Sequence, residues 1–407
     1  MTRPLLLVIS TGPRRFREYL FESMTTRYRI HLLNTVEPTW ENAYVEAATV
    51  VPNTDADVLL EAARAVAAST PVAGVLSWDE ARIHQAAIVA RALGLPTTDP
   101  DAVWRCRDKH ATRSALAAAN VPQPRFALVG TVDKALAAAA EIGYPVVVKP
   151  RAAAASYGVI LVRTPEELAA HFTFSAEATV PHAPSYDESV LVEEYLDAPE
   201  ISIDSVVRGG VVQGLFVARK ELAYAPYFEE VGHVVTHHDP LLRDPEVLRV
   251  LQDTHSALGF TDGWTHAEFK VTPNGLKVIE VNGRLGGDLI PYLGMRSSGI
   301  DPGLIAAAVS CDLEQEITVD RELVAAVRFF YVENDETVIE SVEFDNVALP
   351  SQIDSVVTLV APGTIVSPPP KGINSGRVAF ATAVAPTADE CRAALDGAQA
   401  ALVVTSR

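Results

Sequence analysis

Residues 265–288 carry the pattern that most constrains how this chain can fold. Their sequence, THAEFKVTPNGLKVIEVNGRLGGD, predicts two strands joined by a tight turn at Pro273-Asn274-Gly275, because Asn-Gly between alternating runs is a strong hairpin signal. A hairpin centred on Asn274 pairs Glu268 with Glu280 and His266 with Asn282.

Alternation along the two strands sorts the side chains of this hairpin onto two faces. The polar face is expected to bring together Glu268, Glu280 and Asn282, and Arg284 extends that line if the strand continues. Two carboxylates directly across a strand pair repel each other, so a positive group is expected between them. Carboxylate and amide oxygens suit Mg²⁺ or Mn²⁺, although an amphipathic hairpin with a solvated polar face has the same pattern. The residues expected to enter a core are Ala267, Phe269, Val271, Ile279 and Val281.

Composition narrows the classes of protein that the chain can belong to. Its 407 residues suffice for about two to four globular domains. The net charge of −19 argues against a nucleic-acid-binding surface. Cys106, Cys311 and Cys391 lie far apart without metal-type spacing, which predicts inert thiols and a reducing, cytoplasmic setting. No run approaches the roughly 18 apolar residues of a membrane span, so no membrane partner is expected.

Strand and helix patterns alternate over residues 4–105, which predicts a small parallel sheet with helices on both faces. Residues at the carboxyl ends of such strands line ligand crevices, so Thr11-Gly12 and Ser77 to Glu80 are candidate contacts, although ordinary loop polars have the same pattern. No G-x-G-x-x-G follows the first strand, which argues against a dinucleotide site.

Residues 106–120 predict one helix, on which Lys109 and Arg113 share a face that is solvated by default. The apolar strand 145–149 ends at Lys149, where an ammonium group is well placed to meet a phosphate. The small-residue loop 151–158 that follows would let backbone N–H groups approach phosphate oxygens.

The second half of the chain reads as strands, one irregular segment and a terminal unit. Strand 189–192 leads into Glu193-Glu194-Tyr195-Leu196, and Glu200 opens the strand 201–207. Residues 220–239 are expected to be irregular, and their histidines show no spacing that enforces a metal site. From about residue 320, short β segments and a helix over 387–402 predict a separate α+β unit.

This ordered set of motifs resembles the ATP-grasp superfamily, and it is most similar to the carboxylate–amine ligases typified by bacterial L-amino acid (dipeptide) ligases. The set comprises Lys109, Lys149-Pro150, Glu193 to Leu196, Glu200, and Glu268 with Glu280-x-Asn282-x-Arg284. The resemblance implies a multidomain α/β fold. Its expected parts are a Rossmann-like N-terminal domain (1–105), a helical linker with the lid subdomain (106–188), a second α+β subdomain (189–318) and a small α+β C-terminal domain (319–407).

The resemblance also implies a role for each motif. Lys109 and Lys149 would contact ATP phosphates, with Ser156 and Gly158 of an unusually alanine-rich loop beside them. Glu193 to Leu196 would read adenine, through backbone groups and the Glu193 side chain, and Glu200 would hold the ribose. Glu268, Glu280 and Asn282 would hold one or two Mg²⁺ ions. Arg284 would bind the acyl phosphate, and a loop at Gly232-His233 would close over the substrate. The acceptor pocket would include Gly286, Gly287 and Asp288. Further pocket candidates are Glu80, His233, Arg328 and the tyrosines at 224, 227 and 292.

The implied reaction joins a carboxylate to an amine through an acyl phosphate, giving an amide or dipeptide, ADP and phosphate. Both substrates would be small molecules, with amino acids expected, and the product would be a peptide-like natural product. Two alternatives remain open at this stage: an enzyme that uses carboxyphosphate or formyl phosphate, and a nucleotide-binding protein without turnover. Arg328 and Arg296 could each pair with a substrate carboxylate, but a structural ion pair is an equally good interpretation. The family also suggests a homodimer.

Overall fold

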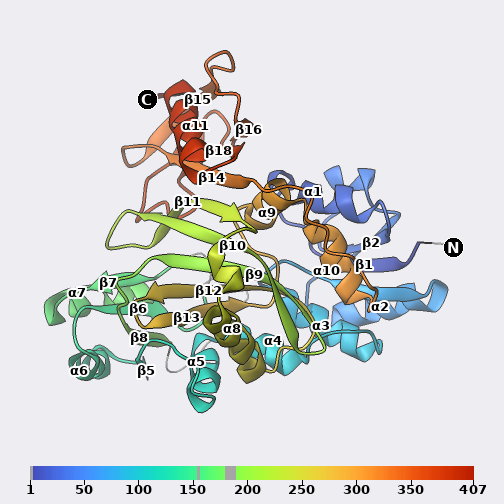
Figure 1. The fold of residues 1–407 in the computed structure, drawn as a ribbon, viewed down its shortest axis with the longest axis horizontal. Coiled ribbons are helices and arrows are strands. Elements are labelled where there is room, and N and C mark those ends of the chain that lie inside the picture. The colour runs from blue at the N-terminus through green and yellow to red at the C-terminus, as the bar shows by residue number, and fades with distance from the viewer. Residues whose placement is uncertain (1–2, 154–155, 179–188) are drawn as a thin grey trace.

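The computed structural model describes residues 3–153, 156–178 and 189–407 (Figure 1). Two alanines of the predicted phosphate loop, at positions 154 and 155, lie outside the described residues, as do residues 179–188, which precede the predicted strand 189–192. Three sheets organise most of the described chain: a parallel sheet near the N-terminus, a small antiparallel sheet and a large sheet that runs through the centre. The functional residues lie where these parts meet.

The N-terminal sheet is parallel, as predicted, and has the strand order β3-β2-β1-β4. Alternate residues of its central strand enter two different cores: Leu5, Leu7 and Ile9 pack beneath α2 and α3, while Leu6 and Val8 pack against α1 and α10. Helices therefore cover both faces. The elements are β1 (Leu5–Ile9), α1 (Arg14–Met24), β2 (Arg29–Asn34), a 3-10 turn (Trp40–Ala43), β3 (Ala47–Val50), α2 (Ala56–Ser69), β4 (Val72–Leu76), α3 (Ile83–Ala92) and α10 (Pro302–Ser310).

The helical linker consists of two helices rather than the single one predicted. Asp108 separates them, because its carboxylate caps the second helix by accepting from the backbone N–H groups of His110 and Ala111. An antiparallel sheet with the order β5-β8-β6-β7 follows, and we call it the lid sheet. Its strand β8 lies beyond residue 188, where the lid was expected to end. The elements are α4 (Pro100–Arg107), α5 (Lys109–Ala118), β5 (Phe126–Val129), α6 (Val132–Ile142), β6 (Val146–Pro150), β7 (Ile160–Val162), α7 (Pro165–Ala176) and β8 (Val190–Glu194).

The central sheet has the order β13-β12-β9-β10-β11-β14-β18-β16. Residues 220–239 are mostly strand rather than irregular: β10 continues to Ala223, and β11 pairs with both β10 and β14. The C-terminal strands therefore join the same sheet as the hairpin, so they do not form the separate unit that was expected. The strands are β9 (Glu200–Arg208), β10 (Val211–Ala223), β11 (Glu229–Thr236), β12 (Gly263–Thr272), β13 (Gly275–Asn282), β14 (Val324–Tyr331), β16 (Ile353–Thr358) and β18 (Arg377–Ala385).

The remaining elements flank this sheet. Helix α11, which Thr387 caps as predicted, packs on β14 and β18 above a third apolar core. A short sheet of β17, β15 and β19 closes that end of the molecule. These elements are a 3-10 turn (Pro240–Arg243), α8 (Pro245–Leu258), α9 (Ile290–Ser298), β15 (Thr337–Phe344), β17 (Ile365–Val366), α11 (Ala388–Ala401) and β19 (Leu402–Ser406).

The hairpin of β12 and β13 has the predicted pairs, Glu268 with Glu280 and His266 with Asn282. Its register then shifts, because Phe269 pairs with Val278 and leaves Ile279 as the extra residue of a β-bulge. The bulge turns Val278 into the core, whereas Ile279 faces the cavity described below. The prediction that Ile279 enters the core is therefore wrong.

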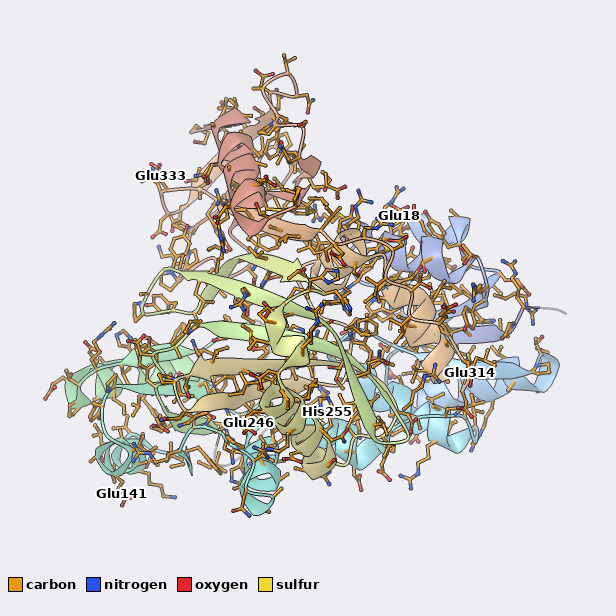
Figure 2. The ribbon with its side chains drawn as sticks, in the orientation of Figure 1. Glu18, Glu141, Glu246, His255, Glu314 and Glu333 are labelled. Atoms are coloured by element: carbon orange, nitrogen blue, oxygen red, sulfur yellow. The ribbon has the colours of Figure 1, made fainter. Side chains whose placement is uncertain are left out.

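The packing of α8 on this hairpin includes a buried histidine, His255 (Figure 2). Its ring nitrogens lie 2.7 Å from the carbonyl oxygen of Leu251 and 2.7 Å from the hydroxyl of Thr265. Burial lowers the pKa of His255 from 6.5 to about 4. The folded protein therefore keeps this ring neutral where the unfolded chain would protonate it.

We expect His255 to make the fold sensitive to acid. Its contribution to the free energy of unfolding is complete above pH 6.5 and is lost as the pH falls through about 4. The loss is on the order of 3 kcal/mol, from a pKa difference of about two and a half units. Urea denaturation of the wild type and of His255→Gln across this range measures it. The wild type should lose more stability than the variant, and parallel pH profiles would contradict the assignment.

The sequence predicted no membrane-spanning segment and three inert thiols. In this part of the chain no helix combines the length and apolar character that crossing a membrane requires. All three cysteines are free thiols, and burial raises the pKa of Cys106 to about 12 and that of Cys391 to about 11.

Candidate functional site

A cavity of about 620 Å³ lies between the lid sheet, the hairpin, α1 and the start of β18. Its walls include the predicted residues of the nucleotide, metal and acceptor sites, although they lie far apart in the sequence. The predicted residues that line it are Lys109, Lys149, Ser156, Glu193, Glu194, Tyr195, Leu196, Glu200, Glu268, Glu280, Asn282, Arg284, Gly287 and Asp288.

At the lid end, the carboxylate of Glu193 joins two cations. Arg113 donates to both of its oxygens, at 2.7 and 3.1 Å, and the ammonium group of Lys149 lies 2.7 Å away. Burial alone would raise the pKa of Glu193, but Arg113 and Lys149 lower it to about 2. The Glu193 side chain, predicted to read adenine, is thus held by protein cations, and the adjoining backbone and residues 194–196 remain at the cavity wall.

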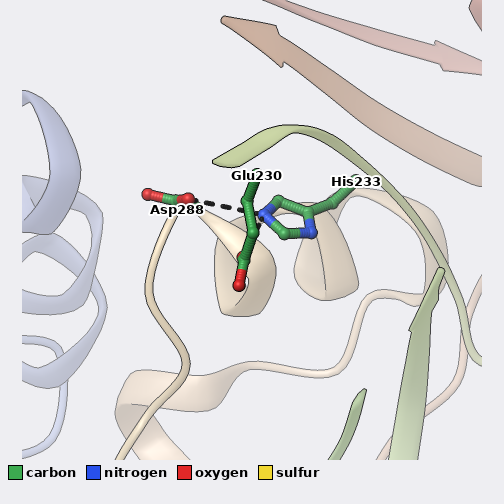
Figure 3. A group of neighbouring side chains, drawn as sticks. All are labelled: Glu230, His233 and Asp288. Atoms are coloured by element: carbon green, nitrogen blue, oxygen red, sulfur yellow. Dashed lines mark hydrogen bonds and ion pairs between the residues drawn. The ribbon is translucent and has the colours of Figure 1, made fainter. Parts of the chain in front are cut away.

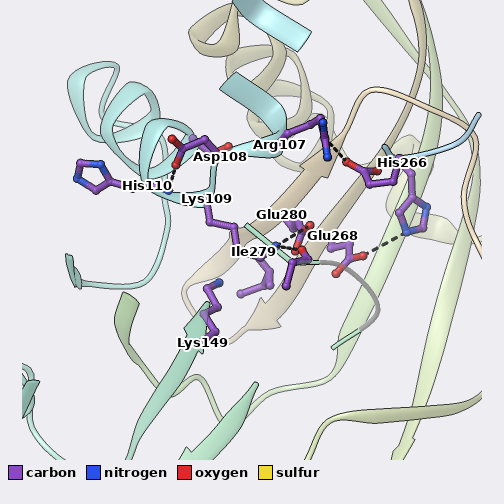
Figure 4. A network of polar contacts seen from close by, with 12 residues as sticks. Arg107, Asp108, Lys109, His110, Lys149, His266, Glu268, Ile279 and Glu280 are labelled. Carbon is purple, nitrogen blue, oxygen red and sulfur yellow. Dashed lines mark hydrogen bonds and ion pairs between the residues drawn. The ribbon is translucent and has the colours of Figure 1, made fainter. Parts of the chain in front are cut away.

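Arg113 does not lie on a solvated helix face, because its side chain is only 1% exposed. Its guanidinium also donates to the carbonyl oxygens of Val278 and Ile279, at 3.1 and 2.8 Å. Lys109, on the same face, donates to the carbonyl oxygen of Ala153 at 2.7 Å and pairs with Glu280 at 3.2 Å (Figure 4). The face of α5 that carries these two residues therefore connects the hairpin to the lid.

The acidic face of the hairpin is accompanied by positive charge, as the opposed carboxylates require. Lys109 lies beside Glu280, and Glu268 lies 2.8 Å from Lys220 and 3.3 Å from His266 (Figure 4). Burial would raise the pKa of Glu268, but Lys220 and His266 hold it well below its usual range. Burial would lower the pKa of His266, but Asp204 and Glu268 raise it to about 9.

Lys220 is a site residue that the sequence did not single out. Its buried ammonium group lies 3.0 Å from Glu200, 2.9 Å from Glu230 and 2.8 Å from Glu268. The oxygens of these three glutamates lie within 4.8 Å of one another. Burial lowers the pKa of Lys220, but Glu230, Glu268 and Glu200 together raise it well above 10.5. Lys220 therefore stays charged and neutralises part of this acidic cluster.

The residues present fit a divalent cation. Glu268, Glu280 and Asn282 offer hard oxygen ligands to the cavity, which is the donor set that Mg²⁺ prefers. The lysine beside each of the two carboxylates indicates that this wall favours positive charge.

Arg284 follows the hairpin and is positioned by the N-terminal domain. Its Nε donates to Glu80 at 2.5 Å, and Nη1 donates to the carbonyl oxygen of Leu285 at 2.8 Å. Burial would lower the pKa of Arg284, but Glu80 raises it, so the guanidinium stays charged. Glu80, predicted to bind substrate, does not line the cavity and instead orients Arg284. Arg107, 3.5 Å from Glu80, completes this group.

A second polar cluster, formed by Glu230, His233 and Asp288, shares Glu230 with the acidic cluster around Lys220 (Figure 3). His233 is fully buried on β11, not in a loop, and its Nε2 lies 3.3 Å from Glu230 and 3.5 Å from Asp288. Arg377 of β18 pairs with both oxygens of Asp288, at 2.7 and 3.0 Å. Burial would raise the pKa of Asp288, but Arg377 and His233 lower it. Strands β11 and β18 thus place this cluster beside the loop 286–288.

Other predicted residues lie outside the cavity. Arg328 pairs with Asp396 of α11 at 2.6 Å, and Arg296 pairs with Asp354 at 2.5 Å, so both make structural ion pairs. Gly158 packs between Pro150 and Ala178, and Gly286 donates its N–H to Asp204. Residues 224, 227 and 292, three tyrosines considered as pocket candidates, also do not line it.

Several cavity residues escaped the sequence analysis because no local motif marks them. Arg17 on α1 and Arg377 on β18 enter the cavity only through tertiary packing. Glu230, which also lines the cavity, and Lys220, which is buried beside it, fell in the segment expected to be irregular. The valines at 231, 234 and 235 were the available signal for β11.

Comparison with known proteins decides the family. Residues 142–292 match the model of the ATP-grasp domain, and residues 33–97 match that of the ATP-grasp N-terminal domain. The chain belongs to the ATP-grasp ligase family. Its family is that of the ADP-forming ligases, whose members use ATP with Mg²⁺.

Relatives of this ATP-grasp ligase align with between about half and nearly all of its length. The uncharacterised protein y4rH of Sinorhizobium fredii is 29% identical over 398 residues, which are 95% of this chain and 79% of that protein. D-Alanine–D-alanine ligase of Pseudomonas entomophila is 26% identical over 54% of this chain and 69% of its own. The crystal structure of an L-amino acid ligase from Bacillus licheniformis covers both chains completely with a TM-score of 0.81 at 21% identity. At that identity the likeness shows the fold, and it confirms the predicted multidomain α/β architecture.

Proposed function

We propose that this ATP-grasp ligase joins the carboxylate of one small molecule to the amine of another, with amino acids as both substrates. The single observation that carries the proposal is the shared cavity, where Lys109 and Lys149, the carboxylates of Glu268 and Glu280, and Arg284 face one space. A chain with this arrangement can activate a carboxylate as an acyl phosphate and then pass it to a nitrogen nucleophile. We place this activity in the cytoplasm.

The nucleotide occupies the lid end. Adenine lies along the backbone of 193–196, the ribose meets Glu200, and Lys109 and Lys149 balance the phosphate charge. Glu268, Glu280 and Asn282 would hold Mg²⁺, which would supply positive charge to neutralise the phosphates. With the phosphate charge balanced, an oxygen of the substrate carboxylate attacks the γ-phosphorus and ADP leaves.

Arg284 serves the second half of the reaction. The amine nitrogen attacks the carbonyl carbon of the acyl phosphate, giving a tetrahedral intermediate whose oxygen carries negative charge. The Arg284 guanidinium, fixed by Glu80, stabilises that oxygen. Phosphate then leaves and the nitrogen loses its proton, which gives the amide. Glu230, which lines the cavity beside His233, suits a substrate ammonium group.

Phosphate release across a matrix of paired L-amino acids, with ATP and Mg²⁺, tests this proposal when the mixtures are read by mass spectrometry. We expect release that needs two amino acids, together with a product of their summed mass minus water. Release that bicarbonate or formate alone triggers would replace the proposal with a carboxyphosphate or formyl phosphate reaction. Binding of ATP without release under any condition would contradict catalysis.

The metal assignment makes a separate prediction. Glu280→Gln removes a charged ligand, so the Mg²⁺ concentration for half-maximal activity should rise about 10- to 100-fold. Mn²⁺ binding followed by electron paramagnetic resonance provides a readout without turnover and should weaken in parallel. Glu141→Gln makes the same change at an exposed glutamate of α6 and should leave both values unaltered. Unchanged Mn²⁺ affinity in Glu280→Gln would show that the metal binds elsewhere.

A further inference from the structure

Arg17 lies near the start of α1 and lines the cavity. Figure 1 shows α1 and the lid sheet on opposite sides of the molecule. This end of the cavity is lined by Phe16, Leu359 and Val360 together with Arg377. The nucleotide residues 193–196 belong to the lid end, so the surroundings of Arg17 are available to a substrate.

Arg17 differs from most cations that line the cavity in its lack of an ion-pair partner. Within the described residues, no carboxylate lies at ion-pair distance from its guanidinium. Its Nη1 donates to the carbonyl oxygen of Gly286, at 3.2 Å. By contrast, five of the other six lysines and arginines in the cavity wall each pair with a carboxylate: Lys109 with Glu280, Lys149 with Glu193, Lys270 with Glu200, Arg284 with Glu80 and Arg377 with Asp288. The sixth, Arg15, is exposed and donates to the backbone carbonyl oxygens of Thr358 and Leu359.

The position of Arg17 is costly for a cation. Burial within the cavity wall lowers the pKa of Arg17 and the nearby Arg284 guanidinium lowers it further, and the opposing effects of Tyr19 and Asp288 do not restore it. The first turn of α1 also contains no acidic residue, so the helix end adds positive potential. An anion bound here would relieve all three effects. The bond to Gly286 fixes one edge of the guanidinium and leaves its remaining donors for such an anion.

We propose that Arg17 binds a spectator carboxylate, meaning a substrate carboxylate other than the one that is activated. The inference rests on the proposed ligation, in which the activated carboxylate meets ATP and Arg284. A planar guanidinium matches a carboxylate through two parallel hydrogen bonds. The spectator group is either the α-carboxylate of the amine substrate or the side-chain carboxylate of an acidic amino acid.

Equilibrium binding tests the inference without turnover. The twenty L-amino acids and their α-amides are titrated calorimetrically into protein saturated with Mg²⁺ and a non-hydrolysable ATP analogue. The wild type is compared with Arg17→Met, Arg17→Lys and the control Arg14→Gln. Arg14 is one turn away, exposed, and paired with Glu18 at 2.8 Å. Comparing aspartate with asparagine and glutamate with glutamine isolates a side-chain carboxylate, whereas the α-amides isolate the α-carboxylate.

We expect the wild type and Arg14→Gln to bind at least one carboxylate about 10- to 100-fold more tightly than its matched amide. Arg17→Met should reduce that ratio to near one, and Arg17→Lys should retain part of it. A ratio that survives in Arg17→Met, or no acid that binds the wild type better than its amide, would overturn the inference. Discrimination in binding combined with silence in the phosphate-release matrix would instead overturn the proposed ligation and leave Arg17 as an anion-binding residue.

Discussion

Replacing Arg284 with methionine is expected to lower kcat for phosphate release about 100- to 1,000-fold while changing the KM for ATP by less than about threefold. The reason is that Arg284 would act where charge develops on the substrate, whereas the proposed nucleotide site lies at the lid end of the cavity. Glu80→Gln should weaken the same step less, because it loosens the orientation of the guanidinium without removing it.

Arg328→Gln is the control for this experiment. Sequence reasoning offered Arg328 as a substrate residue, but in the fold it pairs with Asp396, away from the cavity. We therefore expect its kcat and KM to remain near the wild-type values. A loss in Arg328→Gln equal to that in Arg284→Met would contradict the placement of the site, as would full activity in Arg284→Met.

The second large effect concerns stability. Arg113→Met should lower the free energy of unfolding by about 3–5 kcal/mol, because it leaves buried Glu193 with half of its cationic partners. It also removes the donors to Val278 and Ile279 at the bulge. Urea denaturation at neutral pH measures this loss directly.

Arg125→Gln supplies the matched comparison. Arg125 pairs with Glu194 at 3.8 Å, next to the same strand, but its side chain is 61% exposed. Removing an exposed pair of this kind should change stability by less than about 0.5 kcal/mol. Equal losses in both variants would mean that burial of the Arg113 cluster contributes nothing beyond an ordinary surface ion pair.

Local patterns in the sequence predicted elements whose periodicity is strong. The parallel sheet within residues 4–105 and the hairpin around Asn274 were expected, and both are present. The pairing of Glu268 with Glu280 followed from one turn and a period of two, which fixes register over a few residues. These features depend on neighbours in the chain, so the sequence alone contains the information.

Features set by distant parts of the chain could not be predicted in the same way. The bulge at Ile279 accompanies bonds from Arg113, which lies on a helix more than 160 residues earlier. Arg113 itself looks like a surface residue until β8 brings Glu193 against it. Arg17 and Arg377 come from opposite ends of the chain and reach the site only after the three sheets have assembled.

Arg377 in the cavity wall comes from β18, a strand that begins at residue 377 of 407. This part of the wall is therefore the last to be synthesised. During synthesis, the lid end of the cavity can form on a nascent chain well before that strand leaves the ribosome. Until β14 arrives, the edge of β11 presents unpaired backbone groups of the kind that recruit other chains. Chains truncated after the hairpin should therefore associate through this edge and form no amide, and engineering of this enzyme has to keep its C-terminal strands.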